Sequence, residues 1–261
     1  MPEFGIIGGS GLYRIPGLEI LEEMTVSTPY GDPSGSFTIG RLSGKEIAFL
    51  PRHGAGHTLQ PHKINYRANI RGFRQLGVRR LLSVFATGGI RPDLAPGSIV
   101  VPDQIIDSTS GRASTFFDQD EVVHIDFTEP FCPMLRNFLG RAAKRAKVDL
   151  LCKGTYLCVN GPRLETAAEI RAYALLGADI VGMTAMPEAA LAREAGICYA
   201  GLSVVTNHAA GISEKKLTVT EVKEVMGSSE ERLSSILKDF FMLQFKIPAC
   251  SCRQTLETAR M

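Results

Sequence analysis

Asn207 is the residue whose position most clearly suggests chemistry. It follows an apolar run over residues 199–205 that is typical of a buried strand. Polar residues just past the carboxyl end of such a strand are where open α/β sheets bind ligands. An amide both donates and accepts hydrogen bonds, so it fits a ring that offers both functions, such as a 6-oxopurine with O6 and a protonated N7. Taken alone, Asn207 and Gly211 are more typical of a plain turn, and this alternative stays open.

A second group of residues suits an oxyanion. Arg52 and His53 follow an expected strand over residues 46–50, and a guanidinium beside an imidazole fits phosphate. The Gly-Gly-Ser-Gly loop over residues 8–11 follows another expected strand, so its backbone N–H groups and the Ser10 hydroxyl can hold one small anion. The loop lacks the third glycine of a dinucleotide-binding motif and the lysine of a P-loop. A tight turn is the alternative interpretation.

Histidines close to Arg52 raise the question of a metal. His53, His57 and His62 lie within ten residues, but Pro61 and two glycines break the helix that an i, i+4 pair of ligands needs. We therefore expect no metal ion in this segment.

Glu165, Met183 and Thr184 complete the set of candidates. Glu165 precedes an expected helix, where a carboxylate is favoured electrostatically. It is either an ordinary first-turn acid or an acceptor for the N1–H of a 6-oxopurine. Met183 and Thr184 end an expected strand, where a methionine can pack on a flat ring and a hydroxyl can donate to an anion. Ordinary core packing of Met183 is the alternative.

Strands and helices alternate along the chain, which predicts one α/β domain with helices on both faces of a central sheet. Thr166 and Thr218, each three residues before a glutamate, predict capping boxes, and the Gly-Ser-Ser segment 227–229 is a candidate kink. The expected strands are 4–8, 46–50, 81–85, 98–101, 155–159, 180–183 and 197–205, and the expected helices are 64–76, 133–147, 166–176, 187–194 and 218–245.

The composition is that of an ordinary globular protein, with 44% hydrophobic and 21% charged residues among 261. A net charge of +2 gives no argument for a nucleic-acid or membrane partner. No apolar run reaches the roughly 18 residues of a transmembrane helix. The first residues lack the charged and apolar regions of a signal peptide. We therefore expect a cytoplasmic protein.

The cysteines form two groups. Four lie in apolar segments and are expected as small buried hydrophobes: Cys132, Cys152, Cys158 and Cys198. Cys250 and Cys252 lie close to the C-terminus. A zinc site needs four ligands, and no second pair of cysteines or histidines stands at a suitable spacing. The two residues are therefore expected either as exposed thiols or in structural disulfides, which intracellular proteins of hyperthermophiles use.

Several ordered motifs resemble the trimeric purine nucleoside phosphorylase and methylthioadenosine phosphorylase family. They cover nearly the whole chain, at residues 5–11, 52–54, 62–69, 127–133, 161–163, 182–184 and 187–189. The resemblance implies a single-domain phosphorylase/hydrolase-like α/β fold over residues 1–246, with a central mixed β-sheet flanked by helices. A tail over residues 247–261 follows, and its Cys-x-Cys resembles the one that forms disulfides in thermophilic archaeal members. A homotrimer, or a hexamer built as a dimer of trimers, is also implied.

The family resemblance implies phosphorolysis, in which inorganic phosphate attacks C1′ of a purine nucleoside and releases the base and a ribose 1-phosphate. Phosphate is then a co-substrate, and neither a cofactor nor a metal is required. Catalytic roles fall on Asn207, Arg52 and His53. The residues implied to line the phosphate site are Ser10, Arg52, His53, Ala86 and Thr184.

Three positions concern the base. Members specific for 6-aminopurines resemble one another in having Asp where this chain has Asn207 and Ala209, and a small hydroxyl residue in place of Glu165. An adenine amine needs acceptors, whereas a 6-oxo group facing a carboxylate is repelled. These residues, with His208 beside them and Met183 against the ribose and base, predict hypoxanthine or guanine as the base.

The 5′ end of the substrate is expected at Val219. Members that act on ordinary nucleosides resemble one another in a His near the start of the last helix, and an apolar side chain at this position suits a methylthio group instead. His124 is expected to reach the 5′ pocket of a neighbouring subunit, or else to be a surface histidine. The prediction is a phosphorylase of 5′-methylthioinosine, with inosine and guanosine as further substrates. Alternatives are a methylthioadenosine phosphorylase, a hydrolytic nucleosidase and a non-catalytic purine-binding protein.

Overall fold

The computed structural model describes residues 1–119, 121–214, 218–245, 250–257 and 259–261. Over these residues, ten strands form one mixed sheet, ordered β2-β3-β4-β1-β5-β9-β8-β7, with β10 paired to β5 and β6. The strands are β1 (Phe4–Gly8), β2 (Glu19–Met24), β3 (Phe37–Leu42), β4 (Lys45–Pro51), β5 (Arg80–Gly89), β6 (Ile99–Val100), β7 (Gln104–Ser108), β8 (Thr155–Val159), β9 (Ile180–Gly182) and β10 (Cys198–His208). The mixed α/β fold expected from the sequence is confirmed.

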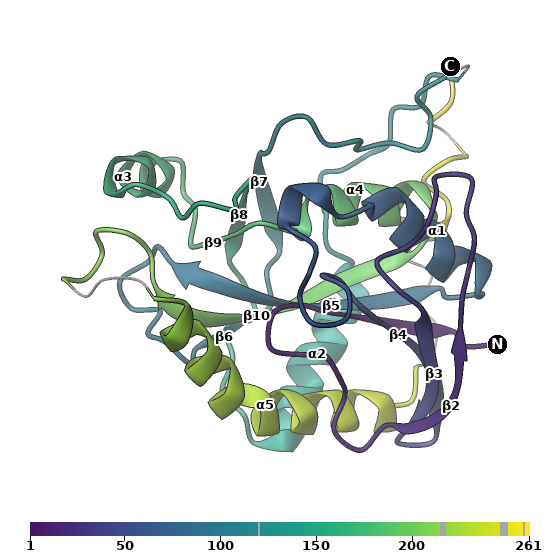
Figure 1. Cartoon of the computed structure of the whole chain (residues 1–261), viewed down its shortest axis with the longest axis horizontal. Coiled ribbons are helices and arrows are strands. Elements are labelled where there is room, and N and C mark those ends of the chain that lie inside the picture. Colours follow the sequence, from purple (N-terminus) through teal and green to yellow (C-terminus); the bar gives the residue numbers. More distant parts are fainter. Residues whose placement is uncertain (120, 215–217, 246–249, 258) are drawn as a thin grey trace.

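Helices cover both faces of the sheet (Figure 1). On one face α1 (Tyr66–Gln75) packs against α4 (Ala185–Glu194), and on the other α2 (Pro133–Ala146) packs against the long α5 (Val219–Met242). The helix α3 (Ala167–Leu175) and the short 3-10 helices η1 (Pro61–Lys63) and η2 (Ser251–Arg253) complete the set. Within the described residues, none of the helices has the length and apolar character needed to cross a membrane.

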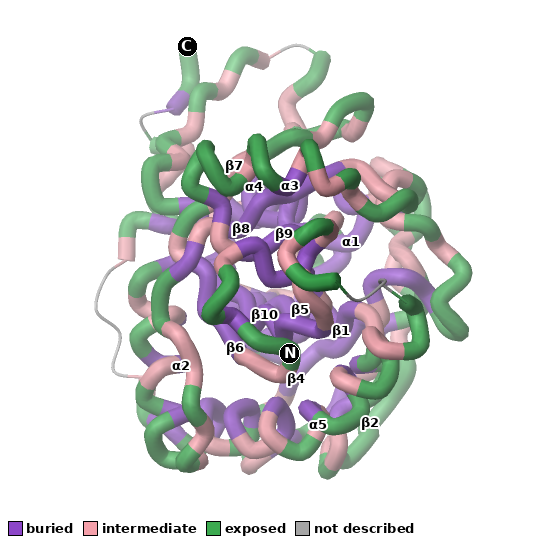
Figure 2. Tube along the Cα trace, turned by 90° about the vertical axis from the view of Figure 1, so that its left-hand side faces the viewer, coloured by how far each residue is buried: buried purple, intermediate pink, exposed green. Residues whose placement is uncertain are grey.

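Alternation of side chains along β10 divides the core into two layers. Leu202 and Val204 pack into the layer under α2 and α5, whereas Tyr199 and Val205 pack into the layer under α1 and α4. A strand that is buried on both faces has a continuous run of apolar residues, which is why β10 could be predicted from the sequence. Figure 2 shows the central strands buried and the connecting loops exposed.

The central strand β5 has a gap along one side, and this gap shapes the site. Its first residues, Arg80–Ser83, pair with β1, and its last two, Gly88 and Gly89, pair with β9. The described pairings on that side leave residues 84–87 without a neighbour, while β10 pairs along the whole other side. The β1 and β9 chains therefore diverge around the middle of β5, where they make room for side chains.

Sequence patterns missed three strands and misplaced one break. The strands β2, β3 and β7 were not expected, and β2 is an exposed, acidic edge strand that has no apolar periodicity. The candidate kink at 227–229 was wrong, since α5 runs through it with Ser229 buried. The capping box at Thr166 is complete, whereas Thr218 accepts only the backbone N–H of Glu221. The expected domain boundary at 246/247 lies outside the described residues.

Candidate active site

One cavity of about 320 Å³ lies at the carboxyl ends of β1, β4, β5, β9 and β10. The strands β1, β4, β5 and β10 run parallel, so residues that follow them meet at one edge of the sheet. Eight of the predicted site residues line this cavity: Ser10, Arg52, His53, Ala86, Glu165, Met183, Thr184 and Asn207. Loop residues 57–61 and Val222 of α5 complete its wall.

Four predicted site residues do not line the cavity. His208 and Ala209 follow Asn207, and the Ala209 side chain packs into the core. His124 is exposed, and its backbone N–H donates to Ala259 O at 2.8 Å. Val219 is 70% exposed, whereas Val222, three residues further along α5, lines the cavity. Val219 is the first residue of α5, and side chains of a helix tilt toward its N-terminus, so this one points off the end.

Arg52 is fixed in a buried network with Glu188. Its Nη2 donates to Glu188 Oε2 at 3.2 Å, its Nε donates to Glu188 Oε1, and its Nη2 also donates to Ser83 Oγ. Glu188 further accepts from Ser83 Oγ and Tyr199 Oη, both at 2.8 Å. The carboxylate is fully buried and the guanidinium is 1% exposed. The fork of Arg52 therefore holds a protein carboxylate, a partner that the sequence did not indicate.

The glycine loop and the gap in β5 bring Arg52 to the cavity. Its Nη1 donates to Val84 O at 3.0 Å, inside the unpaired stretch of β5. A Cβ at Gly9 would lie 2.6 Å from this nitrogen and 2.4 Å from Val84 O, so only glycine permits the approach. Four of the five N–H donors of Arg52 are thus used within the described part of the chain. One remains to point toward a ligand.

His53 lies beside Arg52 as a neutral acceptor. Its Nδ1 is 2.8 Å from Leu59 O, so this nitrogen carries the proton and Nε2 is the acceptor. Burial and the charge of Arg52 lower the pKa of His53 to about 4. The His57 ring stacks on it at 4.2 Å between centroids, and Tyr13 Oη lies 2.9 Å from His57 Nδ1. His57 was seen in the sequence only as a rejected metal ligand.

A β-bulge aims Asn207 into the cavity. The register of β10 against β5 shifts between Val205 and Asn207, and a bulge of this kind turns the following side chain. Thr206 Oγ1 donates to Asn207 Oδ1 at 2.8 Å, and Asn207 Nδ2 donates to His208 O at 2.9 Å. The amide is therefore held with a defined orientation next to Thr87 and Gly88, which also line the cavity.

Glu165 shares the cavity with Asn207 and lies just before α3. Burial raises the pKa of its carboxyl, with the nearby charge of Glu169 acting in the same direction. Arg163 offsets part of this effect and forms its own ion pair with Glu169 at 2.7 Å. Glu165 is thus a half-buried acceptor that forms no ion pair with any residue the structure describes, which is the character needed to receive an N–H from a ligand.

Arg112 supports the back of the site and was not predicted. Its Nη1 donates to Met183 O at 2.8 Å and to Met186 O at 2.6 Å, and its Nη2 donates to Asn160 O at 3.0 Å. It lies in a segment without regular secondary structure, so no periodicity could have marked it. It fixes the backbone that presents Met183 and Thr184.

A cavity with a few polar side chains, at the strand ends of a mixed α/β sheet, is where α/β proteins bind small molecules. The family model described as the phosphorylase superfamily matches residues 3–241. The chain belongs to this family, as its sequence motifs predicted, and its class is that of the nucleoside phosphorylases, which are pentosyltransferases.

Three relatives illustrate the match. The chain is 49% identical to a probable S-methyl-5′-thioinosine phosphorylase of Thermodesulfovibrio yellowstonii, over 98% of this chain and 97% of the relative. It is 48% identical to a 6-oxopurine nucleoside phosphorylase of Pyrococcus furiosus, over 99% of both chains. A solved methylthioadenosine phosphorylase from an antarctic soil metagenomic library superposes with a TM-score of 0.93 at 38% identity, over 100% of this chain and 92% of that one.

Proposed function

We propose that this chain cleaves 6-oxopurine nucleosides with inorganic phosphate, 5′-methylthioinosine being the best substrate. The observation that carries the proposal is the single cavity lined at once by Arg52 and His53 and by Asn207 and Glu165. Relatives named for methylthioinosine and for 6-oxopurine nucleosides support the same substrate class.

Phosphate is proposed to bind between the glycine loop and Thr184. The remaining N–H of Arg52, the Ser10 hydroxyl and the Thr184 hydroxyl donate to its oxygens. Neutral His53 accepts the O–H of monohydrogen phosphate at Nε2, which orients an unprotonated oxygen toward C1′ of the nucleoside. A protonated His53 could not accept this hydrogen bond, so its low pKa serves the binding of phosphate.

Bond cleavage transfers negative charge to the purine. The phosphate oxygen bonds to C1′, the C1′–N9 bond breaks, and its electron pair goes to the base. The proton that monohydrogen phosphate gives up is passed on through solvent water to N7 of the base, so the products are a sugar phosphate dianion and a neutral purine. Asn207 then accepts from N7–H through Oδ1 and donates to O6 through Nδ2, while Glu165 accepts from N1–H. Neither residue changes its protonation in this scheme, and the reaction needs no cofactor.

An apolar wall is proposed for the 5′ substituent. Val222 and Leu164 line the cavity near α5 and the loop before α3, and burying a methylthio group there is worth about 1–2 kcal/mol. Cytoplasmic residence and assembly as a homotrimer or a dimer of trimers are part of the same proposal. In such an assembly the exposed His124 would face a neighbouring subunit.

A methylthioadenosine phosphorylase is the second candidate, because the solved relative at 38% identity has that name. The test is release of base from 5′-methylthioinosine, inosine, guanosine and 5′-methylthioadenosine, each with and without phosphate. We expect fast, phosphate-dependent release of hypoxanthine from the methylthio substrate. Faster release of adenine would refute the base assignment, and release without phosphate would indicate a hydrolase. Binding without turnover would indicate a non-catalytic protein.

A further inference from the structure

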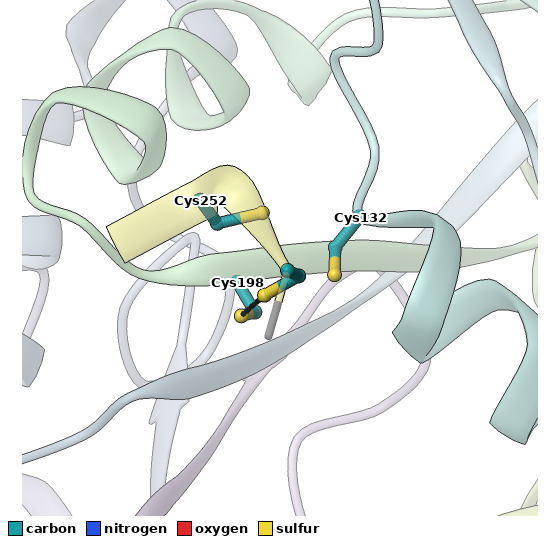
Figure 3. Close-up of side chains that lie close together, drawn as sticks. Cys132, Cys198 and Cys252 are labelled. Atoms are coloured by element: carbon teal, nitrogen blue, oxygen red, sulfur yellow. Dashed lines mark hydrogen bonds between the residues drawn. The ribbon is translucent and has the colours of Figure 1, made fainter. Parts of the chain in front are cut away.

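Four of the six cysteines meet at one point away from the active-site cavity. Cys132, Cys198, Cys250 and Cys252 place their Sγ atoms within 4.8 Å of one another, and all are free thiols. Cys132 precedes α2, Cys198 begins β10, Cys250 precedes η2 and Cys252 lies within it, and Figure 3 shows the labelled side chains converging from these three elements. The expectation that no second pair accompanies Cys250 and Cys252 was wrong, because the fold supplies that pair from distant segments.

We propose that these four cysteines bind a structural zinc ion. Zinc in such sites takes four thiolates at about 2.3 Å in a tetrahedron, which puts the sulfurs about 3.8 Å apart. The closest pair, Cys198 and Cys250, has its sulfurs 3.2 Å apart, and the widest separation stays below 4.8 Å. The four sulfurs are thus already at the spacing of a tetrahedral site, and small shifts of side chains would close it.

The surroundings of the sulfurs suit a closed structural site. Cys132, Cys198 and Cys252 are buried and Cys250 is half-buried. Structural zinc sites are closed in this way, with every ligand supplied by side chains of the protein.

The zinc would have a structural role. Asn207 lies nine positions after Cys198 along β10, roughly 30 Å at the rise of a strand. Four protein ligands also leave no open position for a substrate. The ion would instead anchor the C-terminal tail, whose last residues hold the segment of His124: His124 N–H donates to Ala259 O, and Arg260 pairs with Glu121 at 3.1 Å.

The test is the metal content of the chain, purified under argon with a reductant and desalted. We expect about one zinc per chain by elemental mass spectrometry. An organomercurial should release this zinc in proportion to its reaction with four thiols. Replacement by Co²⁺ should give the sulfur-to-cobalt charge-transfer band and strong visible bands of a tetrahedral tetrathiolate site.

Matched variants separate this site from adventitious binding. Replacing both tail cysteines, Cys250→Ser with Cys252→Ser, should lower the zinc content at least tenfold, while Cys152→Ser, an exposed cysteine outside the cluster, should not change it. Wild-type chain that takes up neither Zn²⁺ nor Co²⁺ at this site would overturn the proposal, as would disulfides among the four residues in anaerobic peptide maps. A red iron-containing protein would overturn the assignment to zinc. The wild-type measurements stand even if the double variant misfolds.

Discussion

Replacing Glu188 by glutamine tests whether the Arg52 network is the structural base of the phosphate end. Glu188 accepts four hydrogen bonds, two from Arg52 and one each from Ser83 and Tyr199. In Glu188→Gln, one acceptor oxygen becomes an NH₂ group that faces the donors of Arg52. The positive charge of Arg52 then stays buried without a counter-charge.

The magnitude follows from the burial of both partners. Removing one partner of a buried ion pair costs about 3–5 kcal/mol, and Arg52 at 1% exposed has little access to water. For a chain of this size each kcal/mol lowers Tm by roughly 2–4 °C, so we expect a fall of roughly 6–20 °C. Because Arg52 is then no longer held against Val84, kcat/KM for phosphate should fall by at least about tenfold.

Glu194→Gln is the matched control on the same helix. Glu194 is 5% exposed and accepts from Thr115 Oγ1 and Phe116 N–H, both at 2.7 Å, but it forms no ion pair in the described residues. Its loss should cost about 1 kcal/mol. Both variants are compared by thermal and urea unfolding and by phosphate titration of the initial rate. Equal effects of the two variants would show that the charge of Arg52 is not what Glu188 supports.

Three further predictions concern the base, the 5′ group and pH. Asn207→Asp should move the ratio of kcat/KM from 5′-methylthioinosine toward 5′-methylthioadenosine by about 10–100-fold, and an unchanged ratio would remove Asn207 from the base site. Val222→His should raise kcat/KM for inosine relative to 5′-methylthioinosine, whereas Val219→His, at an exposed position, should not. An effect of Val219→His without one of Val222→His would place Val219, as expected from the sequence, at the 5′ end of the substrate. His53 has an unfolded pKa of 6.5 and a folded pKa of about 4, so the unfolded chain binds the proton first as pH falls. Stability should therefore drop by about 3 kcal/mol between pH 6.5 and 4, and His53→Gln should lose this part of the slope in urea unfolding.

The sequence predicted the parts of the site that local patterns encode. Ser10 and Arg52 follow strands of buried apolar residues, and Asn207 lies at the carboxyl end of another; parallel strands bring such residues to one edge. The role of Glu188 was not predicted because this residue lies in a helix that is buried on all sides. A carboxylate is buried there only with a partner, and the partner, Arg52, is 136 residues away in the sequence. Arg112 was not predicted because it lies in a segment without regular secondary structure, where no periodic pattern indicates which side chains are buried.

Long-range geometry explains the remaining errors. The bulge at Thr206 arises from the pairing of β10 with β5, and the gap along β5 from its pairing with β1 and β9, all of them strands far apart in the sequence. The four-cysteine cluster follows the same rule, since Cys132 and Cys198 reach Cys250 only through the packing of α2 and β10. Cys152, which the apolar sequence context placed in the core, is exposed just beyond α2. Local context describes what a residue can do, and the topology decides which residues it meets.

We propose that the end of the cavity at Arg52 and His53 selects phosphate because it carries little free charge. Glu188 matches the charge of Arg52, and His53 stays neutral above a pH of about 4. A guanidinium without a counter-charge would attract any anion. A site whose charge is neutralised must instead recognise its ligand by where its hydrogen-bond donors and its one acceptor, His53 Nε2, are placed. Monohydrogen phosphate offers both, an O–H for His53 Nε2 and oxygens for Ser10 and Thr184. Sulfate has no O–H at neutral pH, so it should inhibit weakly against phosphate in wild-type chain. Replacing His53 by alanine should reduce that difference, and strong inhibition of the wild-type chain by sulfate would refute this account of selectivity.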